Sequence, residues 1–139
     1  MRRVLRNLAI DRRGNSLIEF AILLPVFAYM LYGMLGYGQY FLLAHSVQQL
    51  ANDAARSTVA GMTASERLSL ATATVSAELP ALNELNAAHV TTGVTETSDT
   101  VTVSVRYDAS NVALFKTRIV PMPDALIERR AVVRPGGVA

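Results

Sequence analysis

The chain has 139 residues, of which 13 are Lys or Arg and 11 are Asp or Glu. This length corresponds to about one domain. Charged residues make up 17% and hydrophobic residues 51%, a balance that argues against an intrinsically disordered chain. The chain contains no Cys, which excludes disulfide frameworks, Cys-ligated zinc, iron–sulfur clusters and thiol catalysis.

The positive charge is concentrated at the N-terminus. Residues 1–14 contain five Arg and one acid, whereas the remaining chain carries 8 basic and 10 acidic residues. The main body therefore lacks the basic surface that nucleic acid selects, and we expect no nucleic-acid partner. Arg-rich segments of this kind commonly flank membrane spans.

A long apolar run follows this basic leader. No formally charged residue occurs between residues 20 and 52, and residues 20–38 also lack Ser, Thr, Asn and Gln. Because about 20 apolar residues in a helix span a bilayer, the run predicts a transmembrane helix. Tyr37 and Tyr40 suit the far membrane interface, where the ring stays apolar and the hydroxyl stays hydrated. A buried core helix of a soluble protein is the alternative.

Charge predicts the orientation of this span. Arg12 and Arg13 lie just before it, and the next charged residue on the far side is Asp53. The positive-inside rule then places the N-terminus in the cytoplasm and the C-terminal body outside it. A cleaved secretory signal is the competing interpretation, but the apolar run is longer than usual and no small-residue cleavage site follows it.

Glu19 is an unusual residue at the start of an apolar span. A carboxylate is costly inside a bilayer, so Glu19 either sits at headgroup depth, or is protonated, or has a positive partner. A new α-amino group, made by cutting after Gly14, would lie one helical turn away. Pro25 predicts a kink in the helix, and Gly33 and Gly38 permit close helix approach.

The segment RRGNSLIEF, residues 12–20, resembles a type IV prepilin cleavage site, in which a basic leader ends in Gly and a Glu follows five residues later. Together with Pro25 and the motif ANDAAR at residues 51–56, it resembles the TadE-like family, small pseudopilins of the tight-adherence (Tad, or Flp-type) pilus system. Residues 101–107 and 131–134 resemble the last strands of this family more weakly. GNSLIE also resembles the signature of a type II secretion pseudopilin.

The resemblance implies roles for particular residues. Gly14 would be the last leader residue and Asn15 the new N-terminus, where pilins commonly have an apolar, N-methylated residue. Glu19, together with the neighbouring Phe20, would set the alignment between the helices of adjacent subunits. Pro25 would bend the helix so that it packs in the filament. The implied partners are inner-membrane lipid, other pilins or pseudopilins, the pilus assembly platform and, for leader removal, prepilin peptidase.

The helix is expected to continue past the membrane to Ala60 and to stop at Gly61. One face of this extension is apolar or small and carries Val47, Leu50, Ala51, Ala54 and Thr58. Thr63 and Glu66 form a capping-box pattern that predicts a second helix ending at Pro80. The alternation in residues 68–75 leaves a strand possible there.

Strands are expected in the last third of the chain. Val101, Val103, Val105 and Tyr107 alternate with polar residues, which predicts a half-buried strand. Val90 and Val94 mark its partner, residues 97–99 the turn between them, residues 108–125 a loop, and residues 126–134 a third strand.

These observations predict a pilin-like α+β fold, in which a long N-terminal transmembrane helix precedes a small helix and a three-stranded, mostly antiparallel sheet. The expected organisation is a leader over residues 1–14, a helix over 15–61 and an extracytoplasmic domain over 62–139. This small domain is expected to lean on the long helix, on neighbouring subunits, or on both. No catalytic motif or metal-ligand spacing occurs, and His45 and His89 are isolated, so we expect neither an enzyme nor a cofactor. A signal-anchored periplasmic binding module is the alternative from another functional class.

Overall fold

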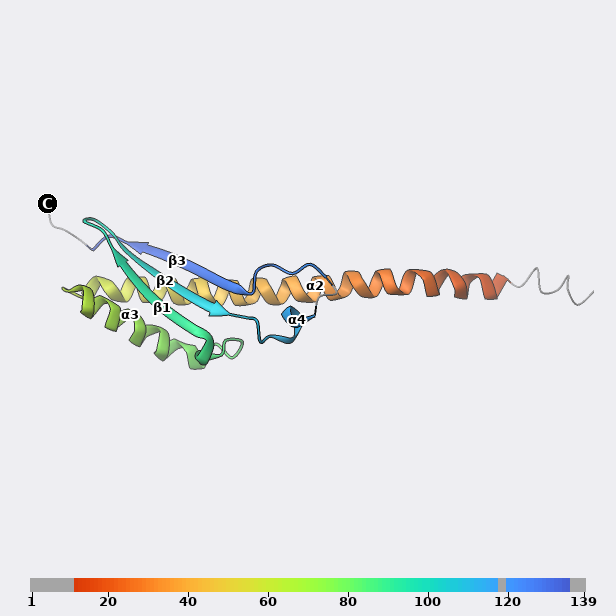
Figure 1. Cartoon of the computed structure of the whole chain (residues 1–139), viewed down its shortest axis with the longest axis horizontal. Coiled ribbons are helices and arrows are strands. Elements are labelled where there is room, and N and C mark those ends of the chain that lie inside the picture. Colours follow the sequence, from red (N-terminus) through yellow and green to blue (C-terminus); the bar gives the residue numbers. More distant parts are fainter. Residues whose placement is uncertain (1–11, 118–119, 136–139) are drawn as a thin grey trace, which may run out of the picture. The chain divides into compact units, whose positions relative to one another are not determined.

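A computed structural model describes residues 12–117 and 120–135, with side chains from Ser16 onward in these ranges. The chain divides into two compact units, Met1–Leu35 and Gly36–Ala139. Of the expected leader, residues 1–11 lie outside the described residues. The elements, shown in Figure 1, are three α-helices (α2 to α4), three short 3-10 turns (η1 to η3) and three strands in the described part of the chain.

α2 is an α-helix of 46 residues, Arg12–Ser57, and the 3-10 turn η1, Thr58–Ala60, follows it directly. The predicted stop is confirmed, because Gly61 is extended and its N–H donates to the carbonyl oxygen of Thr58 (3.0 Å). Pro25 lies inside α2, a position that membrane helices tolerate.

α3 (Ala64–Glu78) begins at the predicted capping box. The N–H of Glu66 donates to Thr63 Oγ1 (3.3 Å), and Glu66 Oε2 accepts from the N–H groups of Met62 (2.8 Å) and Thr63 (3.1 Å). These N–H donors hold the pKa of the Glu66 carboxyl below its ordinary value. The box satisfies backbone donors that would otherwise lack partners in the first helical turn.

The alternating pattern in residues 68–75 forms helix and not strand. Ala71 and Val75, four residues apart, are both buried, so the helical period decides which side chains enter the core. α3 ends at Glu78, and Pro80 lies in the next 3-10 turn, η2 (Leu79–Ala81).

The sheet has three strands in the order β1 (Val90–Glu96), β2 (Val101–Asp108) and β3 (Leu126–Val133), and both pairings are antiparallel. The predicted turn between the first two strands is closed by a hydrogen bond from Thr97 N–H to the carbonyl oxygen of Thr100 (2.9 Å). The fold class predicted from the sequence is confirmed, with a fully antiparallel sheet.

The segment between β2 and β3 differs from the predicted loop, because it contains a four-residue helix, α4 (Ala113–Lys116). The carbonyl oxygen of Val112 accepts from Phe115 N–H (3.0 Å), and the Phe115 ring packs against the core. A tertiary contact therefore favours a turn of helix where the sequence shows no helical period.

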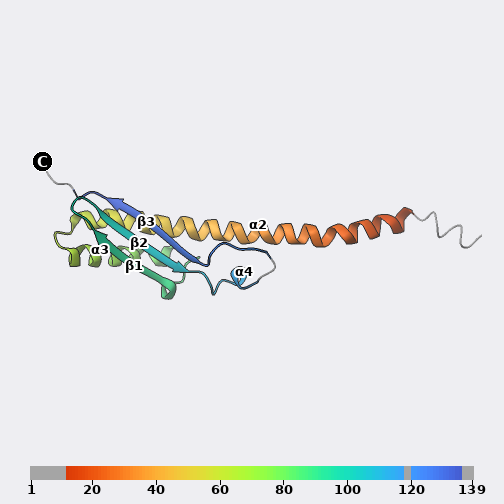
Figure 2. The same ribbon diagram turned by 45° about the horizontal axis from the view of Figure 1, so that its top comes forward.

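One face of the sheet packs on both longer helices. The alternate β2 residues Val101, Val103, Val105 and Tyr107 are at most 3% exposed and form one cluster with Leu50 of α2 and other buried side chains. Figures 1 and 2 show α3 and the later part of α2 behind the sheet. The small domain packs on the long helix, one of the two supports expected from the sequence, because side chains of α2 form much of its core. Packing on neighbouring subunits stays a prediction.

Candidate membrane and assembly helix

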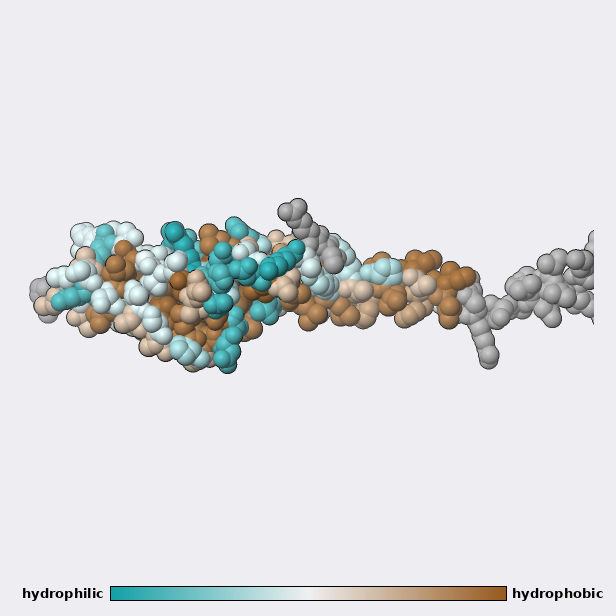
Figure 3. Space-filling view, turned by 60° about the horizontal axis from the view of Figure 1, so that its bottom comes forward, coloured by the Kyte–Doolittle hydropathy of each residue, from teal (hydrophilic) through white to brown (hydrophobic). Residues whose placement is uncertain are grey.

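The part of α2 in the first unit exposes its apolar side chains. The large apolar residues that are exposed here range from 42% at Leu31 to 73% at Leu17. Within Ser16–Ala60, the part of α2 and η1 whose side chains are described, the most apolar stretch of 18 residues has a mean hydropathy of 1.8. None of this stretch is buried. Figure 3 shows the apolar (brown) surface along this part of the chain. By length and composition the helix can cross a membrane once, which is consistent with a single-pass anchor.

Glu19 and Phe20 lie near the start of this apolar surface, and both are exposed, Phe20 at 64%. Among the residues whose side chains are described, none forms an ion pair with Glu19. An exposed carboxylate on an apolar helix is available to a positive group from outside the described residues. Its role in subunit registration stays a prediction.

Gly14 and Asn15 lie in the first turn of α2, which begins at Arg12. The helix therefore runs across the peptide bond that the resemblance marks for cleavage. Leader removal after Gly14 and the identity of Asn15 as the new N-terminus stay predictions.

The two tyrosines expected at the far membrane interface hold the segment between β2 and β3 against α2. Tyr37 Oη donates to the carbonyl oxygen of Pro121 (3.1 Å). The Tyr40 ring centroid lies 6.4 Å from that of Phe115 and 5.8 Å from that of Phe41. These contacts all lie in the second unit, and a location at the interface stays a prediction.

Sequence reasoning missed the glycine that makes a close contact. A Cβ atom on Gly36 would lie 2.7 Å from Met122 Sδ, whereas a Cβ atom on Gly38 would meet no atom of residues 12–117 or 120–135 within 4 Å. Gly36 is buried and Gly38 is exposed. No signal in the sequence could have found this, because the contact depends on where the distant residue Met122 lies.

A second missed contact joins α2 to the connection before β1. Ser46, only 4% exposed, donates a hydrogen bond from Oγ to Glu84 Oε1. A buried hydroxyl needs such a partner. The apolar or small face predicted for the helix beyond the membrane is confirmed, because its five members in α2 and η1 are all buried: Val47, Leu50, Ala51, Ala54 and Thr58.

In the described part of the chain, no three His, Asp or Glu side chains come together in a way that could hold a metal ion. His45 is exposed. His89 Nε2 lies 3.2 Å from Asn111 Nδ2, so this side chain links the 3-10 turn η3 (Ala87–His89) to the segment after β2.

Residues 14–56 match the family model of the TadE-like proteins. The comparison with curated proteins found no match, and neither did the comparison with solved structures. The TadE-like match begins at the expected last residue of the leader and ends one residue before the end of α2.

The TadE-like segment thus contains both the exposed apolar surface and the face that packs on the sheet, while α3 and the strands lie outside it. The resemblance stated from the sequence is confirmed over these residues. The match covers 43 of the 139 residues, and over this segment it suggests a similarity to Tad pilus-related proteins.

Proposed function

We propose that the protein is a membrane-anchored TadE-like minor pseudopilin that acts in the assembly of a tight-adherence pilus. The observation that supports this most is the exposed apolar surface of α2, which lies within the family match and carries Glu19 near its start. A surface that is apolar on all sides has no favourable environment in water, but it suits lipid and other apolar helices.

In this proposal α2 first holds the protein in the inner membrane, with the N-terminus in the cytoplasm and the second unit in the periplasm. Helices of other pilins then pack against residues 17–35. The Glu19 carboxylate forms an ion pair with the ammonium group of a cleaved N-terminus, either its own or that of a neighbouring subunit. Such a pair offsets the free-energy cost of placing an isolated carboxylate in a low-dielectric environment. Pro25 bends the helix where it packs.

Site-specific photocrosslinking in cells tests the assembly step. A photoreactive residue at Phe20 or Ile22 should give adducts with pilin-like proteins, and the same group at Met62, which is 85% exposed outside the apolar run, should give far fewer. Glu19→Gln should reduce the helix adducts several-fold while Glu19→Asp retains most of them. Adducts with lipid alone would reject assembly and leave a signal-anchored binding module. Adducts with type II secretion pilins would assign the protein to that system.

Mass spectrometry of the native protein tests leader removal. In a strain with active prepilin peptidase, the mass should correspond to loss of residues 1–14, and Gly14→Leu should leave the chain intact. An intact Met1 in the unmodified chain would refute cleavage, and unchanged processing of the variant would refute Gly14 as the recognition residue.

Cysteine labelling tests the orientation, because the chain has no Cys of its own. In cells with a permeable outer membrane, a membrane-impermeant maleimide should label Asp99→Cys and leave Arg3→Cys unlabelled until the inner membrane is lysed. The reverse pattern would overturn the proposed orientation.

A further inference from the structure

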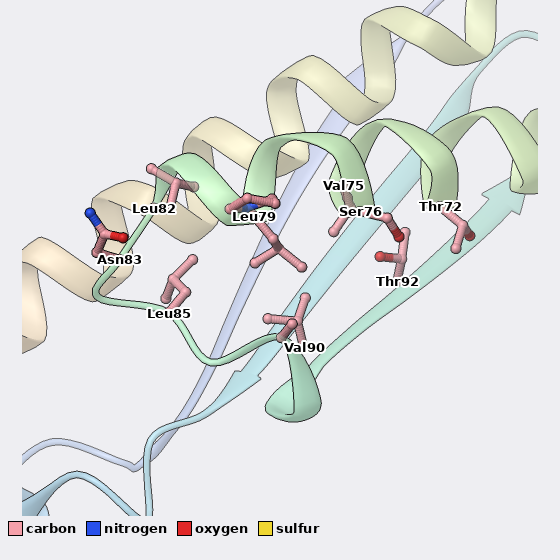
Figure 4. Close-up of a pocket in the computed structure, with 11 residues that line it drawn as sticks. Thr72, Val75, Ser76, Leu79, Leu82, Asn83, Leu85, Val90 and Thr92 are labelled. Atoms are coloured by element: carbon pink, nitrogen blue, oxygen red, sulfur yellow. The ribbon is translucent and has the colours of Figure 1, made fainter.

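A cavity of about 490 Å³ lies between α3, the connection that follows it and β1. Apolar side chains form much of its wall, and hydroxyl groups stand among them; the residues include Val75, Leu79, Leu85, Val90, Ser76 and Thr92. Figure 4 shows Val90 of β1 near Leu79 of η2, and Thr92 of β1 near Ser76 of α3. None of the residues that line the cavity is charged. Its size is within the range of ligand sites, about 300–1,000 Å³.

The strand in the cavity wall is an edge strand. β1 pairs with β2 on one side only. Its first residue, Val90, also donates its N–H to the carbonyl oxygen of Ala87 in η3, and within the described residues no backbone hydrogen bond joins residues 91–96 to an element other than β2. Its seven residues extend for about 24 Å and present N–H and C=O groups to the open edge at alternate positions. Such an edge is a template for another extended chain.

The opposite edge of the same sheet is protected. β3 carries Glu128, Arg129 and Arg130, and Gln48 Nε2 of α2 donates to the carbonyl oxygen of Arg130 (3.3 Å). Charges and covering side chains are the usual protection of an edge. β1 has no Lys, Arg or Pro, and its one charged residue, Glu96, is the last and pairs with Arg67 (2.9 Å).

The helix-facing side of β1 is incompletely covered. Val90 and Thr92 are half-buried, whereas the β2 residues paired with them, Tyr107 and Val105, are at most 3% exposed. The strand residues that line the cavity, Val90 and Thr92, both belong to β1, and none belongs to β2 or β3. The incompletely covered side chains and the unpaired backbone edge therefore belong to the same strand, β1.

We infer that the β1 edge and this cavity receive an extended segment of another polypeptide, which pairs with β1 and places uncharged, apolar side chains at alternate positions into the cavity. Backbone pairing supplies affinity and the cavity selects the inserted side chains. The segment carries no helix of its own on this face, because α3 already packs on β1 and its residues line the cavity.

Peptide binding to the full chain in lipid nanodiscs tests this. The probes are acetyl-KVTVTVK-amide and versions with Ala or Leu at the three Val positions, and empty nanodiscs are the control. At least one probe should bind saturably and slow hydrogen exchange of β1 amides. Two further versions of the probe carry N-methyl groups, one on the backbone nitrogens of its Val residues and the other on those of its Thr residues. One of these two peptides should lose binding and the other should keep it, because only alternate backbone N–H groups face β1.

A matched pair of variants locates the site. Thr92→Lys places a charge in the cavity and should weaken binding at least tenfold, whereas Thr91→Lys, on the other face of the same strand, should change it less than twofold. Equal effects, or no saturable binding by any probe, would overturn the inference. Concentration-dependent protection of β1 without peptide would show that a second copy occupies the edge. Nanodisc binding does not depend on pilus assembly, so failure here leaves the proposed function intact.

Discussion

Two glutamates at opposite ends of α3 have pKa values shifted in opposite directions. The backbone N–H groups of Met62 and Thr63 lower the pKa of Glu66. Burial, followed by the nearby charge of Asp53, raises the pKa of Glu78. The first carboxylate is therefore favoured in the folded state and the second is disfavoured.

The pH dependence of stability should separate these two residues. The Glu66 contribution is present above the ordinary pKa of 4.5 and is lost as the pH falls through the lower folded value. The destabilisation that Glu78 causes is absent below its ordinary pKa of 4.5. It grows as the pH rises from there through the higher pKa of Glu78 in the folded protein. At about pH 7, Glu66→Gln should lower the free energy of unfolding and Glu78→Gln should raise it, and both differences should shrink at about pH 3.5. Urea titrations of full-length protein in micelles measure this. Shifts of equal sign would contradict the assignment.

At the scale of elements, one ion pair joins the start of α3 to the end of β1. Arg67 Nη1 lies 2.9 Å from Glu96 Oε2, and the side chains are only 17% and 26% exposed. Arg67 Nε also donates to the carbonyl oxygen of Gly61 (3.0 Å). Glu96 Oε1 is buried and has no hydrogen-bond partner among the described residues, so removing Arg67 would leave the whole carboxylate without a partner there.

A double-mutant cycle should show this coupling. Arg67→Met should lower the free energy of unfolding by about 1–3 kcal/mol. Adding Glu96→Gln should restore part of this loss, because the second substitution removes the unpaired charge. The exposed pair of Arg106 and Glu128 (2.9 Å, 53% and 25% exposed) is the matched control, and its coupling should be about 0–1 kcal/mol. Additive effects at the first pair would contradict the account.

Local patterns made part of this fold predictable. The alternation from Val101 to Tyr107 and the Thr63–Glu66 capping box each reside in a few neighbouring residues, and the structure confirms both. By contrast, Ser46 and its partner Glu84 are 38 residues apart, and Tyr37 and Pro121 are 84 apart. Contacts at such separation depend on the assembled core, as does the helix α4, so no local pattern indicates them.

The candidate site divides in the same way. The basic leader, Glu19 and the uncharged run after it predict a membrane helix from sequence alone, because charge and hydropathy are properties of each residue. The open edge of β1 is a property of strand order, and its neighbouring cavity depends on how α3 packs. Neither follows from the residues of β1 by themselves.

At the scale of the whole molecule, the proposed function requires residues 17–35 to reside in a membrane. The helix presents large apolar side chains on all sides in this range, and the hydrophobic effect disfavours such a surface in water. Replacing both Leu23 and Phe27 by Arg should impair insertion, at about 2.5–3.5 kcal/mol for each charge near the centre of a bilayer. Replacing them by Ile and Leu is the matched control and should leave insertion unchanged.

Fractionation of cells lysed without detergent tests the membrane anchor most directly. The full-length protein should sediment with the membranes, resist extraction by high salt and alkaline carbonate, and dissolve only when detergent is added. Recovery of the intact chain in the supernatant, as a discrete soluble monomer, would contradict the account.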